Sequence, residues 1–320
     1  MYLRYFDDKR RWSPHGIMFH HFHNSYNRPH AQGSITADEL EHIIKHVGRE
    51  NILPANIWLK KAISRELKER EICLTFDDAL KCQVEVAFPV LRKFEITAFW
   101  FIFSSVFFGD INRLEVYKIF YQTYFSNFGE FYQIFEENLI AFKGQKMYQK
   151  SCKIFSEDEY LSEYEFYSKE ERKFRFFRDH ILVRKEFECL MDRILAQHQT
   201  TPHEISGSVW MTNEDLLMLD SFDHVIGLHS FSHPTNMKQL DAETQKDEYK
   251  KNRDHILSIV NKIPEIVSHP CGSYSKGTLD ILNCLGAKVG FRSNFQKLSH
   301  GFLEFPRVDH SFILTELNQN

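Results

Sequence analysis

The sequence is poor in the features that mark exported, membrane-spanning and nucleic-acid-binding proteins. Its six cysteines are scattered and form no Cys-x-x-Cys pair, so in a chain of this size we expect reduced thiols rather than a disulfide framework. The longest apolar stretch, residues 96–108, contains two serines and is too short to cross a bilayer. Lysine and arginine number 40 against 44 aspartates and glutamates, which leaves no positive excess to attract nucleic acid or an anionic membrane.

The first fourteen residues also lack an apolar core. They carry six charged side chains and do not read as a secretory signal. Together with the scattered cysteines, this predicts a cytoplasmic protein. The hydrophobic share of 42% and the charged share of 26% are typical of a soluble globular protein. No internal repeat is present, and nothing in the sequence predicts the oligomeric state.

Apolar segments alternate with helical patterns on both sides of the middle of the chain. The predicted strands cover residues 16–23, 72–76, 96–103, 225–228, 266–270, 287–291 and 302–308. The predicted helices between them cover residues 37–47, 60–70, 80–94, 214–220, 241–262 and 276–285. This alternation predicts an α/β fold, an irregular (β/α) barrel of about seven parallel strands.

The alternation stops between residues 105 and 207. No proline occurs between Pro89 and Pro202, and 21 of the 47 aromatic residues lie between Ser105 and His180. Their three- and four-residue spacing predicts amphipathic helices. We therefore divide the chain into a barrel, residues 1–104 and 208–320, and an aromatic-rich helical insertion, residues 105–207. The insertion is either a structural appendage or a lid. A lid is favoured because the insertion follows the carboxyl end of a strand, where barrel enzymes build their active face.

Two carboxylates, Asp77 and Asp78, follow the predicted strand 72–76. Adjacent acids at a strand end repel each other, so the pair is stable mainly where a cation or a proton lies between them. The alternative is that they only cap the helix that follows.

A second cluster follows the predicted strand 225–228. His229 and His233 are spaced so that a helical turn after His229 would let both imidazoles converge on one metal ion. Two nitrogens and one carboxylate oxygen form the three-ligand set of a catalytic metal site with positions left open.

Three segments in this order resemble the motifs of the polysaccharide deacetylase family, also called the NodB-homology or carbohydrate esterase family 4 group. They are residues 75–78 (TFDD), 229–234 (HSFSHP) and 269–274 (HPCGSY). The resemblance covers residues 14–104 and 208–310 and also implies a (β/α) barrel.

The family resemblance implies a role for each motif residue. Asp78, His229 and His233 would hold a divalent metal ion, and Asp77 would be the general base. The backbone N–H of Cys271, in the Pro-Cys-Gly turn, would donate to the oxyanion. A nucleophilic role for the Cys271 thiol is a weaker alternative, since a turn cysteine is usually unreactive.

The sequence departs from the family pattern at two places. Many members have an arginine where Ser268 stands, oriented toward the base, and Arg307 is our candidate to replace it. The late Leu-x-His segment that carries the acid histidine in many relatives is missing, which leaves His20 and His310 as candidates for the general acid. The cluster of His20, His21 and His23 could also suggest a second metal site, but alternating side chains along a strand argue against it.

These observations predict a metal-dependent hydrolase that removes an N-acetyl group from an amino sugar. The substrate would be a glycan or an activated-sugar precursor of a surface polysaccharide. The ligands suit Zn²⁺, and Co²⁺, Ni²⁺, Mn²⁺ or Fe²⁺ would also fit. The alternatives are an O-acetyl esterase or N-deformylase using the same site, and a catalytically inactive glycan-binding module.

Overall fold

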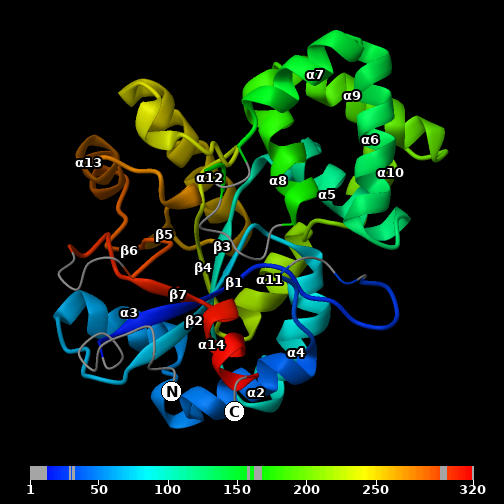
Figure 1. Cartoon of the computed structure of the whole chain (residues 1–320). Coiled ribbons are helices and arrows are strands. Elements are labelled where there is room, and N and C mark those ends of the chain that lie inside the picture. Colours follow the sequence, from blue (N-terminus) through cyan, green and yellow to red (C-terminus); the bar gives the residue numbers. More distant parts are fainter. Residues whose placement is uncertain are drawn as a thin grey trace. The chain divides into compact units, whose positions relative to one another are not determined.

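The computed structural model describes residues 13–28, 30, 33–156, 159–161, 168–295 and 301–318 (Figure 1). Residues 1–12, on which most of the prediction of no secretory signal rests, lie outside this range. The chain divides into two compact units, one formed by Met1–Asp110 with Trp210–Asn320 and the other by Ile111–Val209.

A seven-stranded sheet in the order β6-β5-β4-β3-β2-β1-β7 forms the centre of the first unit, and all of its strand pairs are parallel. The strands are β1 (His15–Phe19), β2 (Ile72–Asp77), β3 (Phe99–Ile102), β4 (Val225–Leu228), β5 (Ile266–Ser268), β6 (Val289–Phe291) and β7 (Arg307–Asp309).

The segment that leads into β7 brings the two edges of the sheet close together. Phe305 forms a parallel bridge with Phe291 at the end of β6, and Gly16 of β1 donates from its N–H to the carbonyl of Pro306. The sheet is therefore a nearly closed barrel, and the predicted irregular (β/α) barrel is confirmed.

Helices surround this barrel (Figure 1). They are α2 (Ala37–Val47), α3 (Ala55–Ser64), α4 (Phe88–Lys93), α11 (Asn213–Ser221), α12 (Ala242–Val260), α13 (Lys276–Cys284) and α14 (His310–Leu317). Side-chain caps define several of their first residues: the Thr36 hydroxyl accepts from the Glu39 N–H at α2, and the Ser275 hydroxyl accepts from the Thr278 N–H at α13. Helix α3 lies earlier in the chain than the helix predicted over residues 60–70. It begins after Pro54 and ends at Arg65, which has a left-handed conformation.

Aromatic rings pack on both faces of the sheet. Phe76 stacks between Phe19 and Trp100, with ring centroids 5.2 and 4.5 Å away. On the other side, Trp58 packs against Phe291 and Phe305. Parallel strands buried on both faces read as continuous apolar runs, which is why the strands were visible in the sequence.

The described part of the second unit consists of helices. They are α5 (Arg113–Tyr124), α6 (Phe128–Lys143), α7 (Gln145–Ile154), α8 (Lys169–Phe176), α9 (Arg184–Gln197) and α10 (Pro202–Ser206). Phe131, Phe135 and Phe174 lie at the centre of an aromatic core that the helices share. The lid role stays a prediction.

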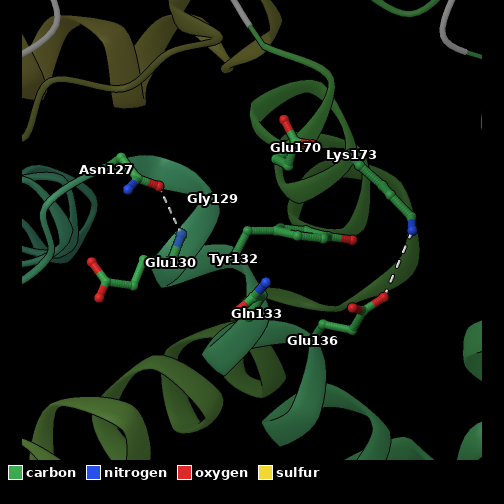
Figure 2. A pocket seen from close by; sticks show the side chains of 8 residues that line it. All are labelled: Asn127, Gly129, Glu130, Tyr132, Gln133, Glu136, Glu170 and Lys173. Carbon is green, nitrogen blue, oxygen red and sulfur yellow. Dashed lines mark hydrogen bonds and ion pairs between the residues drawn. The ribbon is translucent and has the colours of Figure 1, made fainter.

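A polar cavity of about 590 Å³ lies between α6 and α8 in this unit (Figure 2). Glu130, Glu136, Glu170 and Lys173 line it, and the Lys173 ammonium lies 3.8 Å from the Glu136 carboxylate.

Candidate metal centre

The turn after β2 presents the two neighbouring acids. The Asp78 N–H donates to the Phe101 carbonyl on β3, 3.1 Å away, and both Asp78 and Ala79 have positive φ values, 79° and 55°. Non-glycine residues keep such angles mainly where their surroundings enforce them. The structure does not favour the alternative that the acids only cap a helix. The helical segment that follows begins at Lys81, and the two carboxylates face Arg307 and the histidines instead.

A loop after β4 presents the two histidines. It is not the helical turn that would bring His229 and His233 together by spacing alone, because Ser230 and His233 have left-handed φ values of 65° and 56°. The His229 Nδ1 lies 2.8 Å from the carbonyl oxygen of Ser268. A proton on Nδ1 satisfies this carbonyl and leaves the Nε2 lone pair available to a ligand.

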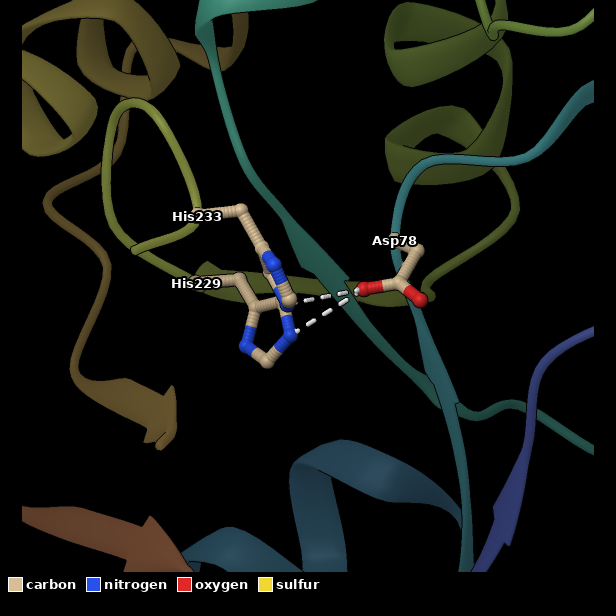
Figure 3. Close-up of side chains that lie close together, drawn as sticks. All are labelled: Asp78, His229 and His233. Carbon is tan, nitrogen blue, oxygen red and sulfur yellow. Dashed lines mark ion pairs between the residues drawn. The ribbon is translucent and has the colours of Figure 1, made fainter. Parts of the chain in front are cut away.

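These elements bring Asp78, His229 and His233 together (Figure 3). Each Nε2 lies 3.3 Å from the Oδ1 of Asp78. In the part of the chain that the structure describes, this is the one group of three histidine, cysteine or carboxylate side chains close enough to share an ion. Among the described residues, the His20–His23 cluster therefore does not supply three such side chains for a second metal site.

The donor set fits a divalent metal ion. The Oδ1 of Asp78 is buried and has no hydrogen-bond partner among the residues that the structure describes, which is costly unless a cation or proton satisfies it. Ligands 2.0–2.1 Å from a tetrahedral ion lie roughly 3.3 Å from one another. Burial raises the pKa of Asp78, but the imidazoles of His233 and His229 outweigh burial and hold that pKa well below its usual range.

Asp77 lies beside this group and is bound by Arg307. The Nη1 and Nη2 of Arg307 donate to the two carboxylate oxygens over 2.7 and 2.8 Å, and the Ser268 hydroxyl donates to Oδ2 over 3.1 Å. Burial raises the pKa of Asp77, but the guanidinium of Arg307 and the imidazole of His229 outweigh it, so that the pKa lies below its ordinary value. Asp77 is therefore an ionised carboxylate with a fixed orientation.

The two candidate acid histidines lie in different surroundings. His20 is 30% exposed at its side chain, and its Nε2 lies 4.0 Å from an oxygen of Asp77 and from one of Asp78. His310 is buried, and its two ring nitrogens lie 3.2 and 3.1 Å from the carbonyl oxygens of Met18 and Gly33. The structure thus brings His20, and not His310, to the cluster.

The predicted oxyanion turn is a single 3₁₀ turn, Pro270–Gly272, in which Cys271 and Gly272 have φ values of 51° and 63°. Within this turn the N–H of Gly272 donates to the carbonyl of His269 over 3.0 Å, so the N–H of Cys271 stays the predicted donor to the oxyanion. Cys271 is exposed overall, yet local burial of the sulfur and the charges of Asp78 and Asp77 raise the pKa of its thiol to about 11. A thiol with such a pKa is a poor nucleophile at neutral pH.

Sequence reasoning missed Gln83, a fully buried residue that links the two strand ends. Its Nε2 donates to the carbonyls of His20 and Asp77 over 2.8 and 2.6 Å. It also missed Glu248 and Asn252 on α12, which bind the backbone of the histidine loop. All three act on main-chain groups, so no motif marks them.

A family model described as "Polysaccharide deacetylase" matches residues 194–290. The match contains His229, His233 and the turn at residues 270–272. The predicted resemblance to the polysaccharide deacetylases is confirmed. The match supports the general prediction of an enzyme of the deacetylase type. No curated protein matches the chain.

Several solved structures, among them two titled as deacetylases, share the fold. The Streptococcus pyogenes deacetylase PplD, solved in complex with acetate, is 15% identical with a TM-score of 0.53, over 95% of this chain and 97% of that one. IcaB from Ammonifex degensii is 12% identical with a TM-score of 0.52, over 96% of each chain. The BpsB deacetylase domain from Bordetella bronchiseptica is 12% identical with a TM-score of 0.51, over 95% and 98%. Among the described helices, none combines the length and the apolar character that a membrane crossing requires.

Proposed function

We propose that this chain is a metal-dependent hydrolase that removes the N-acetyl group of an amino sugar. The convergence of Asp78, His229 and His233 beside a second, separately oriented carboxylate, Asp77, is the observation that carries the proposal. The Asp78 carboxylate faces the two histidines, whereas the Asp77 carboxylate is bound by Arg307. The two adjacent acids are therefore suited to different roles.

Asp78, His229 and His233 would hold the metal ion. When bound, the ion polarises the acyl carbonyl and lowers the pKa of a water molecule. The histidine–carboxylate donor set favours Zn²⁺ and is also compatible with Co²⁺, Ni²⁺, Mn²⁺ or Fe²⁺.

Asp77 would take the proton from the attacking water. Its low pKa keeps it ionised and able to accept, and Arg307 fixes its direction. The N–H of Cys271 would donate to the oxyanion, since electrostatic stabilisation needs donors already in place. His20, which lies close to both acids and is partly exposed, would give a proton to the departing nitrogen.

Elemental analysis of the purified chain tests the ligand set without a choice of substrate. We expect about one equivalent of a divalent ion per chain, and we expect His233→Ala to lose it. The matched control is His42→Ala, because His42 lies on α2, outside the ligand cluster. A wild-type chain that takes up no divalent ion would contradict the ligand set.

Acyl release then tests the reaction. We expect acetate from N-acetylated amino sugars, assayed as oligosaccharides and as nucleotide- or lipid-linked precursors. Faster release of O-linked acetate or of formate would replace the deacetylase assignment by an esterase or a deformylase. Glycan binding without turnover in the metal-loaded chain would support the inactive module instead. The cytoplasmic location stays a prediction that cell fractionation can test.

A further inference from the structure

The loop that carries both histidines cannot hold its conformation by local preference alone. Ser230 and His233 are left-handed, and neither is glycine. Within the loop, the N–H of His233 donates to the Ser230 hydroxyl over 3.1 Å. Contacts from elsewhere must supply the rest of the restraint.

Helix α12 supplies them from two side chains on one face. The Oε2 of Glu248 accepts from the N–H groups of Phe231 and Ser232 over 3.0 and 2.8 Å, and its Oε1 accepts from the Ser232 hydroxyl over 2.7 Å. Asn252 follows four residues later, one helical turn along. Its Oδ1 accepts from the N–H of His229 over 2.9 Å.

Asn252 also ties the loop to the end of β3. It is fully buried, and its Nδ2 donates to the Ile102 carbonyl and to the Ser104 hydroxyl, each over 2.7 Å. The carbonyl of Phe231 accepts in turn from the N–H groups of Ser104 and Ser105. The same β3 strand receives the N–H of Asp78, so these contacts fix both histidines relative to the carboxylate.

We propose that Glu248 and Asn252 are positioning residues that hold the 229–233 loop in the conformation that binds metal. The inference rests on the proposed ligand set and goes beyond it by placing part of the metal affinity on α12. A loop that is ordered before binding loses less conformational entropy when the ion arrives. Loss of contacts outside the ligand shell typically lowers metal affinity about 10–100-fold.

Glu248 offers a way to separate positioning from charge. Glu248→Gln keeps an oxygen for the two N–H groups and an NH₂ that can donate to the Ser232 hydroxyl, but it removes the negative charge. Glu248→Ala removes both. Asp247 is the matched control, because it directly precedes Glu248 on α12, is exposed, and forms an ion pair with Lys251.

The test measures the apparent Kd for Zn²⁺ by competition with a chromophoric chelator, together with thermal unfolding of the metal-free proteins. For Glu248→Ala we expect binding about tenfold weaker or more, and for Glu248→Gln a loss of less than about threefold. Asp247→Ala should match the wild type. The Co²⁺ absorption spectrum should change in Glu248→Ala and not in the control. Asn252→Ala should weaken Zn²⁺ as well, but Glu248→Ala decides the matter if Asn252→Ala fails to fold.

Three outcomes would overturn the inference, and they are distinguishable. Equal Zn²⁺ affinity in Glu248→Ala and Asp247→Ala would remove the positioning role while the ligand set stands. An equal loss in Glu248→Gln and Glu248→Ala would replace hydrogen-bond positioning by an effect of charge. A wild type that binds no divalent ion would overturn the ligand set, and the positioning role with it.

Discussion

Arg307 and Asp77 form two parallel hydrogen bonds in the interior of the barrel, although they lie 230 residues apart in the chain. The side chains are 1% and 3% exposed. The guanidinium also donates to the Ser268 hydroxyl over 2.7 Å and, from Nε, to the Arg292 carbonyl over 2.8 Å. Such a bidentate pair fixes the plane of the carboxylate as well as its charge.

We expect Arg307→Lys to lower both stability and turnover, because an ammonium cannot donate in the fork geometry of a guanidinium. Removing a partner from a buried pair costs about 3–5 kcal/mol, and the lysine, which keeps the charge, should fall near the lower end. Urea unfolding measures the loss. Arg253→Lys is the control, since Arg253 pairs with the exposed Asp254 and should change the free energy of unfolding by less than about 0.5 kcal/mol. Equal effects of the two substitutions would contradict the role given to Arg307.

Asp77→Asn and Asp78→Asn should separate the roles of the neighbouring acids. In Asp77→Asn we expect turnover to fall about 10²–10⁴-fold, the usual contribution of a general base, while the metal content stays at the wild-type level. In Asp78→Asn the metal affinity itself should fall, because a ligand oxygen loses its charge. Metal analysis and acetate release on the same preparations give both values. An Asp77→Asn variant with full activity would remove Asp77 from the base role.

Much of the barrel and of the metal-binding cluster was predictable because both depend on patterns along the chain. The buried strands appear as apolar runs, and Asp77, Asp78 and His229 follow them directly. The path between His229 and His233 was not predictable, because left-handed angles at a serine and a histidine leave no mark in the sequence.

The residues that support the site were harder to predict. Glu248 and Asn252 bind main-chain N–H groups, and every residue has such groups, so nothing in the sequence pairs donor with acceptor. Some predicted strands were also longer than the observed ones. For example, the predicted strand continues to His23, whereas β1 ends at Phe19, because a sequence pattern cannot show where a strand stops pairing with its neighbours.

Acid should destabilise the barrel through His224, which must stay neutral to accept hydrogen bonds. Its Nδ1 accepts from the Ala98 N–H and the Trp100 Nε1–H, each over 3.0 Å. Burial lowers the pKa of His224 from 6.5 to about 4. The unfolded chain therefore binds the proton first as the pH falls. The stabilisation is complete above pH 6.5 and is lost as the pH falls toward 4, by up to about 3 kcal/mol at 1.4 kcal/mol per pH unit.

His224→Asn provides the comparison for that prediction. Asparagine places an acceptor oxygen where Nδ1 lies but does not titrate. Urea unfolding of both metal-free proteins between pH 7 and pH 4 should show a smaller loss in the variant. Parallel pH profiles would mean that His224 has no part in the acid sensitivity.

Closure of the barrel depends on a close backbone approach at Gly290. A Cβ at this position would lie 2.6 Å from the carbonyl oxygen of Leu303 and 2.9 Å from its Cα, and these are main-chain atoms of the segment that joins β6 to β7. We expect Gly290→Ala to lower the free energy of unfolding by about 1–3 kcal/mol, as overpacking does. Gly277→Ala is the control in the first turn of α13, where the nearest atom is 3.6 Å away. There alanine should stabilise the helix by a few tenths of a kcal/mol to about 1 kcal/mol. Urea unfolding of both variants gives the signs, and a Gly290→Ala protein as stable as Gly277→Ala would show that the 301–305 segment can move away without cost.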